Sequence, residues 1–199
     1  MSFMKSLMCL VCLGLMITLS TTVTAQEEAA PQEAVETIEK AADEMKAVKS
    51  PRTEATGMIG EAQVDLAWGA PSVRGRAVYG DLVPYDKVWR TGANEASTIT
   101  VSKNVMIEGE ELAAGTYSLF TIPGEEKWTV IFNSVADQFG HYDYDESNDV
   151  LRVEVEPHTL DEPVETMEMF VKNKDDQSWV GLKWADKKVA FEVAESSSN

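Results

Sequence analysis

Cysteine is scarce in this sequence. The two cysteines, Cys9 and Cys12, both lie inside an apolar run near the N-terminus, and the apolar residues Met8 and Val11 precede them. A lipoprotein signal would place small residues there, so we interpret both cysteines as part of the apolar run. A mature chain that begins after this run has no thiol, which excludes disulfides, cysteine nucleophiles and thiolate metal sites.

Long hydrophobic runs are lacking as well. The N-terminal run extends from Leu7 to Leu19, about 13 residues, whereas a helix that crosses a bilayer needs roughly 20. Lys5 precedes the run and Val23-Thr24-Ala25 follows it, a pattern that favours a secretory signal cleaved before Gln26 over a membrane anchor. We predict a signal peptide over residues 1–25, a periplasmic or secreted protein, and no integral membrane segment after cleavage.

Basic side chains are few. Without Lys5 the chain keeps 16 Lys and Arg residues, one fewer than the 17 of the full sequence, against 34 Asp and Glu residues. Such a negative field repels phosphate backbones and anionic lipid headgroups. Nucleic acid is therefore excluded as an expected partner, while cation binding stays permitted.

Residues 26–52 are rich in Ala, Glu and Lys. Val35, Ile38, Ala42 and Met45 recur at helical spacing and form one narrow apolar stripe. Ser50-Pro51 ends the pattern. We predict an acidic helical spacer over residues 26–52, and a short coiled-coil contact with a partner remains the alternative.

From about residue 60 apolar residues recur at every second position, which is typical of strands. A hairpin is predicted over residues 116–132, with a type II turn at Pro123-Gly124. The other strands are expected around Val64-Leu66-Trp68, Ile99-Val101, Val105-Met106-Ile107, Leu151-Val153-Val155, Met167-Met169-Val171, Val180-Leu182-Trp184 and Val189-Phe191-Val193.

These elements predict an all-β domain over residues 58–194, preceded by the signal peptide and the short helix. About eight or nine short strands separated by turn signals indicate an antiparallel β-sandwich or a jelly-roll-like barrel. The polar residues 195–199 are expected to form a disordered tail.

Residues 70–96 interrupt the alternation with a glycine- and arginine-rich stretch. A long irregular loop inside a compact domain is uncommon unless it is functional.

Four segments of the sequence together resemble the bacterial "domain of unknown function 2911" family. Two of them lie in this stretch, Pro71 to Arg76 and Val83 to Ala96, and the others are Ala114 to Gly124 and Trp128 to Asn133. The resemblance covers about residues 60 to 193.

The resemblance implies an exported protein and brings no established reaction, cofactor or ligand. Two positions depart from the family pattern. Ala70 stands where a larger polar residue is expected, and Phe139-Gly140 stands where a tryptophan-glycine pair is expected. If either position lines a site, the ligand of this protein differs from that of other members.

The best candidate site is the segment from Trp89 to Glu95. The Arg90 guanidinium suits a carboxylate, a sulfate or sugar hydroxyls, and Trp89 offers a face for stacking. Asn94 both donates and accepts hydrogen bonds, and Glu95 accepts them. Arg74 and Arg76 are candidates to join the same site. The alternative is that these residues only hold the loop against the sandwich.

Acidic residues after His141 suggest a second candidate. Asp143, Asp145, Ser147, Asp149 and Glu154 have spacings that imitate a calcium loop, although Asn148 replaces the expected glycine. Calcium is therefore a possible ligand, and an ordinary acidic turn is the favoured interpretation. A site built from both histidines, His141 and His158, is also left open.

Three functions remain. The first is a non-enzymatic binding module for a carbohydrate or small anionic ligand, suggested by the arginine-rich aromatic loop and by the lack of a recognisable catalytic motif. The second is an extracytoplasmic hydrolase in which Glu95 acts as acid or base and Arg90 stabilises charge. The third is a structural or envelope-interaction protein.

Overall fold

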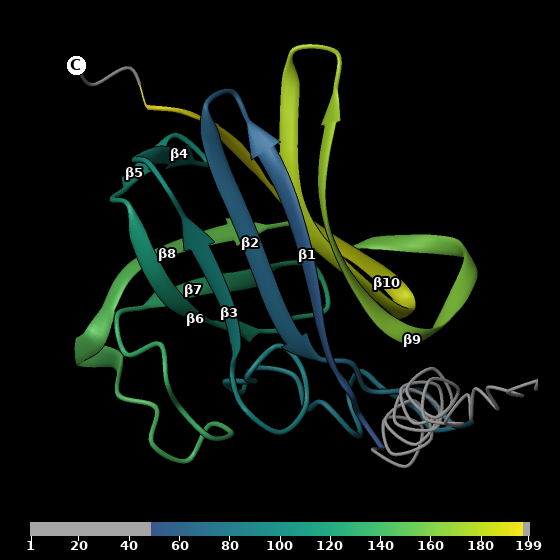
Figure 1. Cartoon of the computed structure of the whole chain (residues 1–199). Helices are drawn as coiled ribbons and strands as arrows, with labels where there is room; N and C mark the ends of the chain where they lie inside the picture. The colour runs from purple at the N-terminus through teal and green to yellow at the C-terminus, as the bar shows by residue number, and fades with distance from the viewer. Residues whose placement is uncertain (1–48, 197–199) are drawn as a thin grey trace, which may run out of the picture. The chain divides into compact units, whose positions relative to one another are not determined.

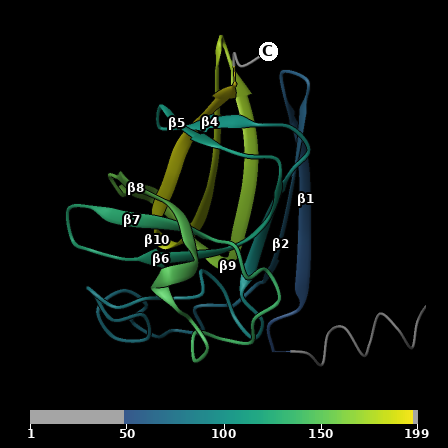
Figure 2. The same cartoon turned by 90° about the vertical axis from the view of Figure 1, so that its left-hand side faces the viewer.

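The computed structural model describes residues 49–196. The predicted signal peptide and nearly all of the predicted helical spacer lie outside these residues. In the described part, ten strands form two antiparallel sheets that pack face to face (Figures 1 and 2). The predicted all-β antiparallel sandwich is confirmed, with slightly more strands than expected.

The larger sheet has six strands in the order β1-β2-β3-β6-β7-β8. The alternation of apolar residues along these strands turns one face of the sheet toward the core, as in β2, where Val64, Leu66 and Trp68 are buried. The bounds are β1 Arg52–Ile59, β2 Ala62–Gly69, β3 Ser97–Val101, β6 Gly115–Ile122, β7 Trp128–Asn133 and β8 Asp149–Val155.

Strand β1 begins ahead of residue 58, where the sequence pattern placed the start of the β domain. Its first residues carry no large apolar side chain, and burial alternates between exposed and half-buried positions until Ile59, the last residue, which is buried. The pairing with β2 is nevertheless regular, from Arg52 opposite Gly69 to Ile59 opposite Ala62. The backbone pairing thus shows a strand that the pattern of apolar side chains does not predict.

The smaller sheet has four strands in the order β5-β4-β10-β9. They are β4 Val105–Ile107, β5 Glu110–Leu112, β9 His158–Lys174 and β10 Gln177–Glu195. Strand β10 includes Glu195, a residue that the sequence pattern placed in the tail.

Strand β10 contains an irregularity at Ala185, which has φ of 50°. The register with β9 shifts on both sides of this residue. The two halves of β10 approach so closely that a Cβ on Gly181 would lie 2.3 Å from the Val189 carbonyl oxygen. The irregularity falls between the two apolar patterns that the sequence assigned to separate strands.

The predicted hairpin of β6 and β7 is confirmed, with Ile122 opposite Thr129 next to the turn. The type II turn is wrong, because Gly124 is not among the residues with positive φ. Glycine is required there for a different reason: a Cβ would lie 2.3 Å from the carbonyl oxygen of Lys127.

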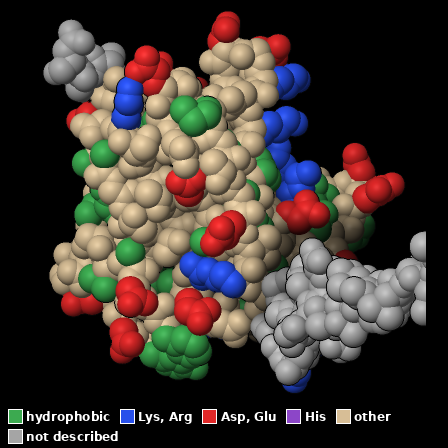
Figure 3. Space-filling model, in the orientation of Figure 1, with side chains coloured by type: hydrophobic (Ala, Val, Ile, Leu, Met, Phe, Trp, Pro, Cys, Tyr) green, Lys and Arg blue, Asp and Glu red, His purple; other side chains and the backbone are tan. Residues whose placement is uncertain are grey.

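Loops gather at one end of the sandwich, where residues 70–96 and the segment between β7 and β8 lie (Figures 1 and 2). Hydrophobic side chains reach the surface at this end, bordered by acidic ones (Figure 3). Tyr142 and Phe139, in the segment between β7 and β8, are 80% and 62% exposed. Residues 70–96 form only isolated bridges, so the predicted irregular loop is confirmed.

Candidate functional site

Backbone hydrogen bonds hold the second half of the long loop against the sandwich. The N–H of Trp89 donates to the Thr121 carbonyl oxygen at 2.7 Å, and the N–H of Thr121 donates back at 2.8 Å. Four residues later, the N–H of Ala93 donates to the Gly69 carbonyl oxygen at 3.0 Å. The segment between these attachments, which contains Arg90, is fixed at both ends by strands of the large sheet.

Glycine at position 69 is part of this attachment. A Cβ there would lie 2.0 Å from the Ala93 carbonyl oxygen, closer than real Cβ atoms approach. The backbone at the end of β2 therefore contacts the backbone of the loop directly, and only glycine, which has no side chain, allows this approach.

A pocket of about 540 Å³ opens beside this segment. Most of its wall is apolar, and its charged side chains are basic. The lining residues are Ser50, Pro71, Arg76, Leu82, Val83, Pro84, Lys87, Val88, Trp89, Arg90, Gly92, Ala93, His141 and Trp184.

Trp89 forms one wall of the pocket and belongs to the core as well. It is 9% exposed, and its ring stacks on Trp184 and meets Trp128 edge to face. Its Nε1 donates to the Gly92 carbonyl oxygen at 3.1 Å. Trp89 therefore has the structural role that the sequence left open, and it also lines the pocket.

Arg90 lines the same pocket and is half-buried. Its Nε is buried and has no hydrogen-bond partner among the described residues. Burial lowers the pKa of Arg90 from its ordinary value, and the nearby Tyr142 raises it by a smaller amount. A guanidinium keeps its charge at neutral pH even so, which leaves a partly desolvated cation with a free donor.

Trp184 supplies a second free donor. The residue is 1% exposed, and its Nε1 is also buried without an acceptor among the described residues. A buried donor without a partner costs about 1–3 kcal/mol, so such groups are rare in folded proteins. Both residues line the same pocket.

The charge of the pocket opposes that of the whole protein. Arg76, Lys87, Arg90 and His141 line it, and no Asp or Glu does among the described residues. The full chain has a formal net charge of −17. Arg76 is held in place because its Nε and Nη2 donate to the carbonyl oxygens of Val73 and Ser72, at 3.0 Å and 2.6 Å.

Arg74 and Asn94, also predicted for the site, hold the chain that leads into β1. The Nη2 of Arg74 donates to the Lys49 carbonyl oxygen at 3.0 Å, and Asn94 Nδ2 donates to the Ser50 carbonyl oxygen at 3.1 Å. Neither residue lines the pocket, whereas Ser50 does. Their bonds therefore fix one part of the pocket rim.

Glu95 lies elsewhere. It is exposed and lines a second, more open hollow of about 440 Å³ together with Arg52 and Gln138. Thr91 and Asn94 both have positive φ, 53° and 65°, so the chain changes direction between Arg90 and Glu95. The structure thus does not bring these two residues into one pocket.

The two histidines belong to different elements of the fold. His141 lines the first pocket and its ring stacks on Tyr142 at 4.9 Å, while His158 begins β9 opposite Lys188. Among residues 49–196, no group of three or more His, Cys, Asp or Glu side chains is placed to hold a metal ion. The geometry offers no support for a site that uses both histidines.

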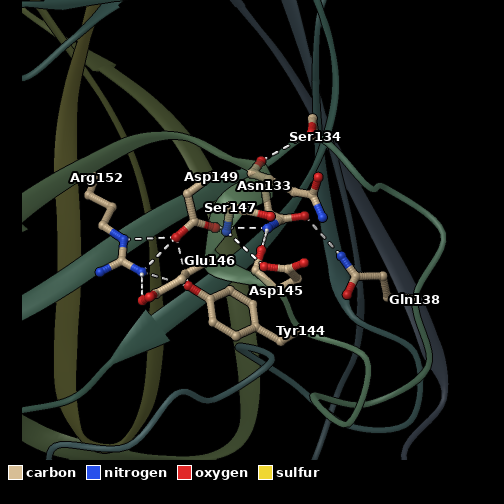
Figure 4. Close-up of polar contacts among 10 residues, drawn as sticks. Asn133, Ser134, Gln138, Tyr144, Asp145, Glu146, Ser147, Asp149 and Arg152 are labelled. Carbon is tan, nitrogen blue, oxygen red and sulfur yellow. Dashed lines mark hydrogen bonds and ion pairs between the residues drawn. The ribbon is translucent and has the colours of Figure 1, made fainter.

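The acidic loop forms a hydrogen-bond network (Figure 4). Asp149 accepts from Asn133 Nδ2 at 2.7 Å and from the Tyr144 hydroxyl at 2.6 Å, and it pairs with Arg152 at 2.7 Å. Asp145 caps the 3₁₀ helix Glu146–Asn148 by accepting from the N–H of Ser147 at 2.9 Å. This bond lowers the pKa of Asp145.

These contacts occupy two of the carboxylates proposed for calcium, Asp145 and Asp149. In the calcium hypothesis a metal ion would supply positive charge to these carboxylates, and here the Arg152 guanidinium supplies it to Asp149. The network accounts for the contacts of these two carboxylates, and the third candidate, Asp143, is not among the residues labelled in Figure 4.

Sequence reasoning did not select Lys87 or Trp184 for the first pocket. Lys87 lies in the same motif as Arg90, so its proximity along the chain was an available signal. Trp184 comes from β10, where it packs against Trp89, and it lines the pocket from there. No local pattern in the sequence marks that contact.

The fold and the pocket define a class: a two-sheet antiparallel β-sandwich with a basic, largely apolar pocket under its long loop. The chain belongs to the family described as protein of unknown function (DUF2911), which matches residues 50–193. No curated protein and no solved structure was found to match the chain. No helix in the described part is long and apolar enough to cross a membrane.

Proposed function

We propose that this protein is a non-enzymatic binding module for a small anionic ligand, which it holds in the pocket beside Arg90. The observation that carries the proposal is the half-buried guanidinium of Arg90 in a pocket lined by three further basic side chains and, among the described residues, by no Asp or Glu. An anion offsets the desolvation of the guanidinium and accepts from its N–H groups, and such charge-assisted bonds are among the strongest in proteins.

A carbohydrate fits the pocket less well. Sugar recognition relies on acceptors and donors placed together, and among the described lining residues there is no Asp, Glu, Asn or Gln side chain. The hydrolase hypothesis loses its support for a geometric reason, because Glu95 and Arg90 line different hollows.

A location outside the cytoplasm belongs to the proposal and rests on the N-terminal sequence pattern.

Thermal melting with a panel of compounds tests this function. Acetate, benzoate, sulfate and phosphate are compared with neutral maltose at equal ionic strength. A ligand that binds only the folded protein raises its stability by about 2.7 kcal/mol at a concentration one hundred times Kd. We expect at least one anion to raise the melting temperature and maltose to leave it unchanged.

A pair of variants that each remove one positive charge separates the pocket from the protein surface. Arg90→Gln removes the proposed contact, whereas Lys103→Gln removes an exposed cation that pairs with Glu61 and does not line the pocket. The anion-dependent shift should disappear in the first variant and persist in the second. Equal shifts in both variants, or no shift with any anion, would show that the pocket is not an anion site and would favour a structural role.

A further inference from the structure

The basic side chains of the pocket have no acidic partner among the described residues. Lys87 and Arg90 take part in none of the ion pairs of the described part, whereas other cations such as Lys103 and Lys127 are paired. The guanidinium of Arg76 donates to backbone carbonyl oxygens. The chain has 34 acidic and 17 basic side chains, so a group of cations without a carboxylate is an exception, and its counter-charge has to be sought outside the described residues.

The chain that leads into β1 passes this pocket. Ser50 lines it, and the carbonyl oxygens of Lys49 and Ser50 accept hydrogen bonds from Arg74 and Asn94. These bonds hold Lys49 at the pocket rim, so the residues just before it start within reach of the cations. Six residues of extended chain span roughly 20 Å, which exceeds the width of a cavity of about 540 Å³.

The sequence just before Lys49, which lies outside the described residues, carries acidic and apolar side chains. Residues 26–48 contain seven Asp and Glu residues against two Lys residues. The carboxylates nearest to the pocket rim along the chain belong to Asp43 and Glu44, and the apolar Met45 follows them. The pocket complements this segment, since its wall presents basic side chains together with apolar ones. Complementary charge and apolar surface on two parts of one chain favour a contact between them.

We infer that Asp43 and Glu44 occupy the mouth of the pocket and place their carboxylates against the cations Lys87 and Arg90. This inference rests on the proposed function, because it assumes that the pocket takes an anion, and it names the group that fills the site when no small anion is bound. A group tethered by a few residues has an effective concentration that is roughly millimolar, so even a weak ion pair is populated. An external anion therefore competes with the acidic segment of the same chain, which lowers its observed affinity.

Zero-length cross-linking of the purified protein with a carbodiimide tests this contact without any variant. The reagent activates a carboxylate, and an amine in contact with it forms an amide, so only groups that touch are joined. We expect peptides in which Lys87 is joined to Asp43 or Glu44. The pair of Lys127 and Glu154, with 2.8 Å between nitrogen and oxygen, is the positive control. A cross-link in the control pair without any product between Lys87 and the two acidic residues would overturn the inference.

A pair of double variants measures the competition by titration calorimetry. Asp43→Asn/Glu44→Gln removes the two carboxylates of the inference, and Asp175→Asn/Asp176→Asn removes two exposed carboxylates from the turn between β9 and β10. Both variants change the net charge by the same amount. We expect sulfate and acetate to bind about threefold more tightly to the first variant than to the unmodified protein, as for a pocket that is free about one third of the time. Their affinity for the second variant should equal that for the unmodified protein.

The outcomes separate the two proposals. If sulfate and acetate bind equally to all three proteins, or gain equally in both variants, the acidic segment does not occupy the pocket while the anion site stands. If sulfate, phosphate, acetate and benzoate all fail to bind Asp43→Asn/Glu44→Gln, in which the competing carboxylates are gone, the anion site itself is wrong and the inference fails with it.

Discussion

The indole rings of Trp89 and Trp184 stack with their centroids 5.8 Å apart. One ring comes from the long loop and the other from β10, so this contact joins the loop to the smaller sheet. The same two side chains form the wall of the pocket. Pocket and core therefore share residues, and each variant in this wall has to be measured for stability and for binding separately.

Arg90→Met is expected to stabilise the protein when no ligand is bound. The guanidinium is half-buried with a free Nε, and methionine fills a similar volume without a charge. We expect a gain of about 0.5–1 kcal/mol in the free energy of unfolding, measured with urea. Arg90→Lys, which keeps the charge, serves as the control and should show no gain. A large loss of stability in Arg90→Met would instead mean that Arg90 holds the loop in place.

Gly69→Ala is expected to disturb the pocket from the side of β2. The new Cβ would lie 2.0 Å from the Ala93 carbonyl oxygen, so the loop has to move away from the sheet. We expect a loss of about 1–3 kcal/mol in stability together with weaker anion binding. Gly115→Ala is a matched control within β6, since its Cβ would meet side-chain atoms of Tyr117, the nearest being the hydroxyl at 3.2 Å, and no backbone atom at closer range. Similar losses in both variants would contradict the close contact at Gly69.

Asp149→Asn is expected to destabilise the loop between β7 and β8. The carboxylate is 6% exposed and accepts from Asn133, Tyr144 and Arg152, and an amide can satisfy only part of this set. We expect a loss of roughly 1–3 kcal/mol, since solvent screens the exposed side of Arg152.

Calcium provides an independent check of the same loop. Because Asp145 and Asp149 already accept bonds from the protein, neither calcium nor a chelator should change the melting temperature of the unmodified protein. A rise in that temperature with calcium, lost in Asp143→Asn, would support a calcium site in this loop.

Tyr144 gives a prediction about alkaline pH. Burial and the hydrogen bond to Asp149 raise its pKa to about 12, above the ordinary value of about 10. The folded protein therefore keeps a proton that the unfolded chain releases. This contribution is fully present below about pH 10 and is lost as pH rises through about 12.

Unfolding in urea at pH 9, 11 and 12 measures this effect. The stability of the unmodified protein should decline relative to Tyr144→Phe over that interval, while lysines titrate in both proteins and cancel. Tyr142→Phe, at a tyrosine that is 80% exposed, is the control and should follow the unmodified protein. Parallel curves for the Tyr144→Phe variant and the unmodified protein would contradict the raised pKa.

Most of the fold could be predicted because its strands bury one face. Val64, Leu66 and Trp68 in β2 alternate with polar neighbours, and that pattern leaves little choice of secondary structure. Strand β1 could not be found in this way, since its pairing depends on backbone hydrogen bonds and not on large apolar side chains. Local signals thus predict buried strands better than edge strands.

The site was predictable in part. Arg90, Trp89 and Arg76 were chosen for their chemistry, and all three line the pocket. Glu95 was also chosen for its chemistry, as a hydrogen-bond acceptor in the same motif, but left-handed backbone at Asn94 turns the chain away before it. Such a turn separates residues that are adjacent in sequence, and only the backbone conformation reveals it.

The bonds from Arg74 and Asn94 to the carbonyl oxygens of Lys49 and Ser50 have a practical consequence. They fix the start of the described chain next to the mouth of the pocket, whereas β10 ends at the opposite end of the sandwich (Figures 1 and 2). A purification tag or a sensor surface attached just before Lys49 would crowd arriving ligand. Attachment after Glu195 leaves the pocket open to solution.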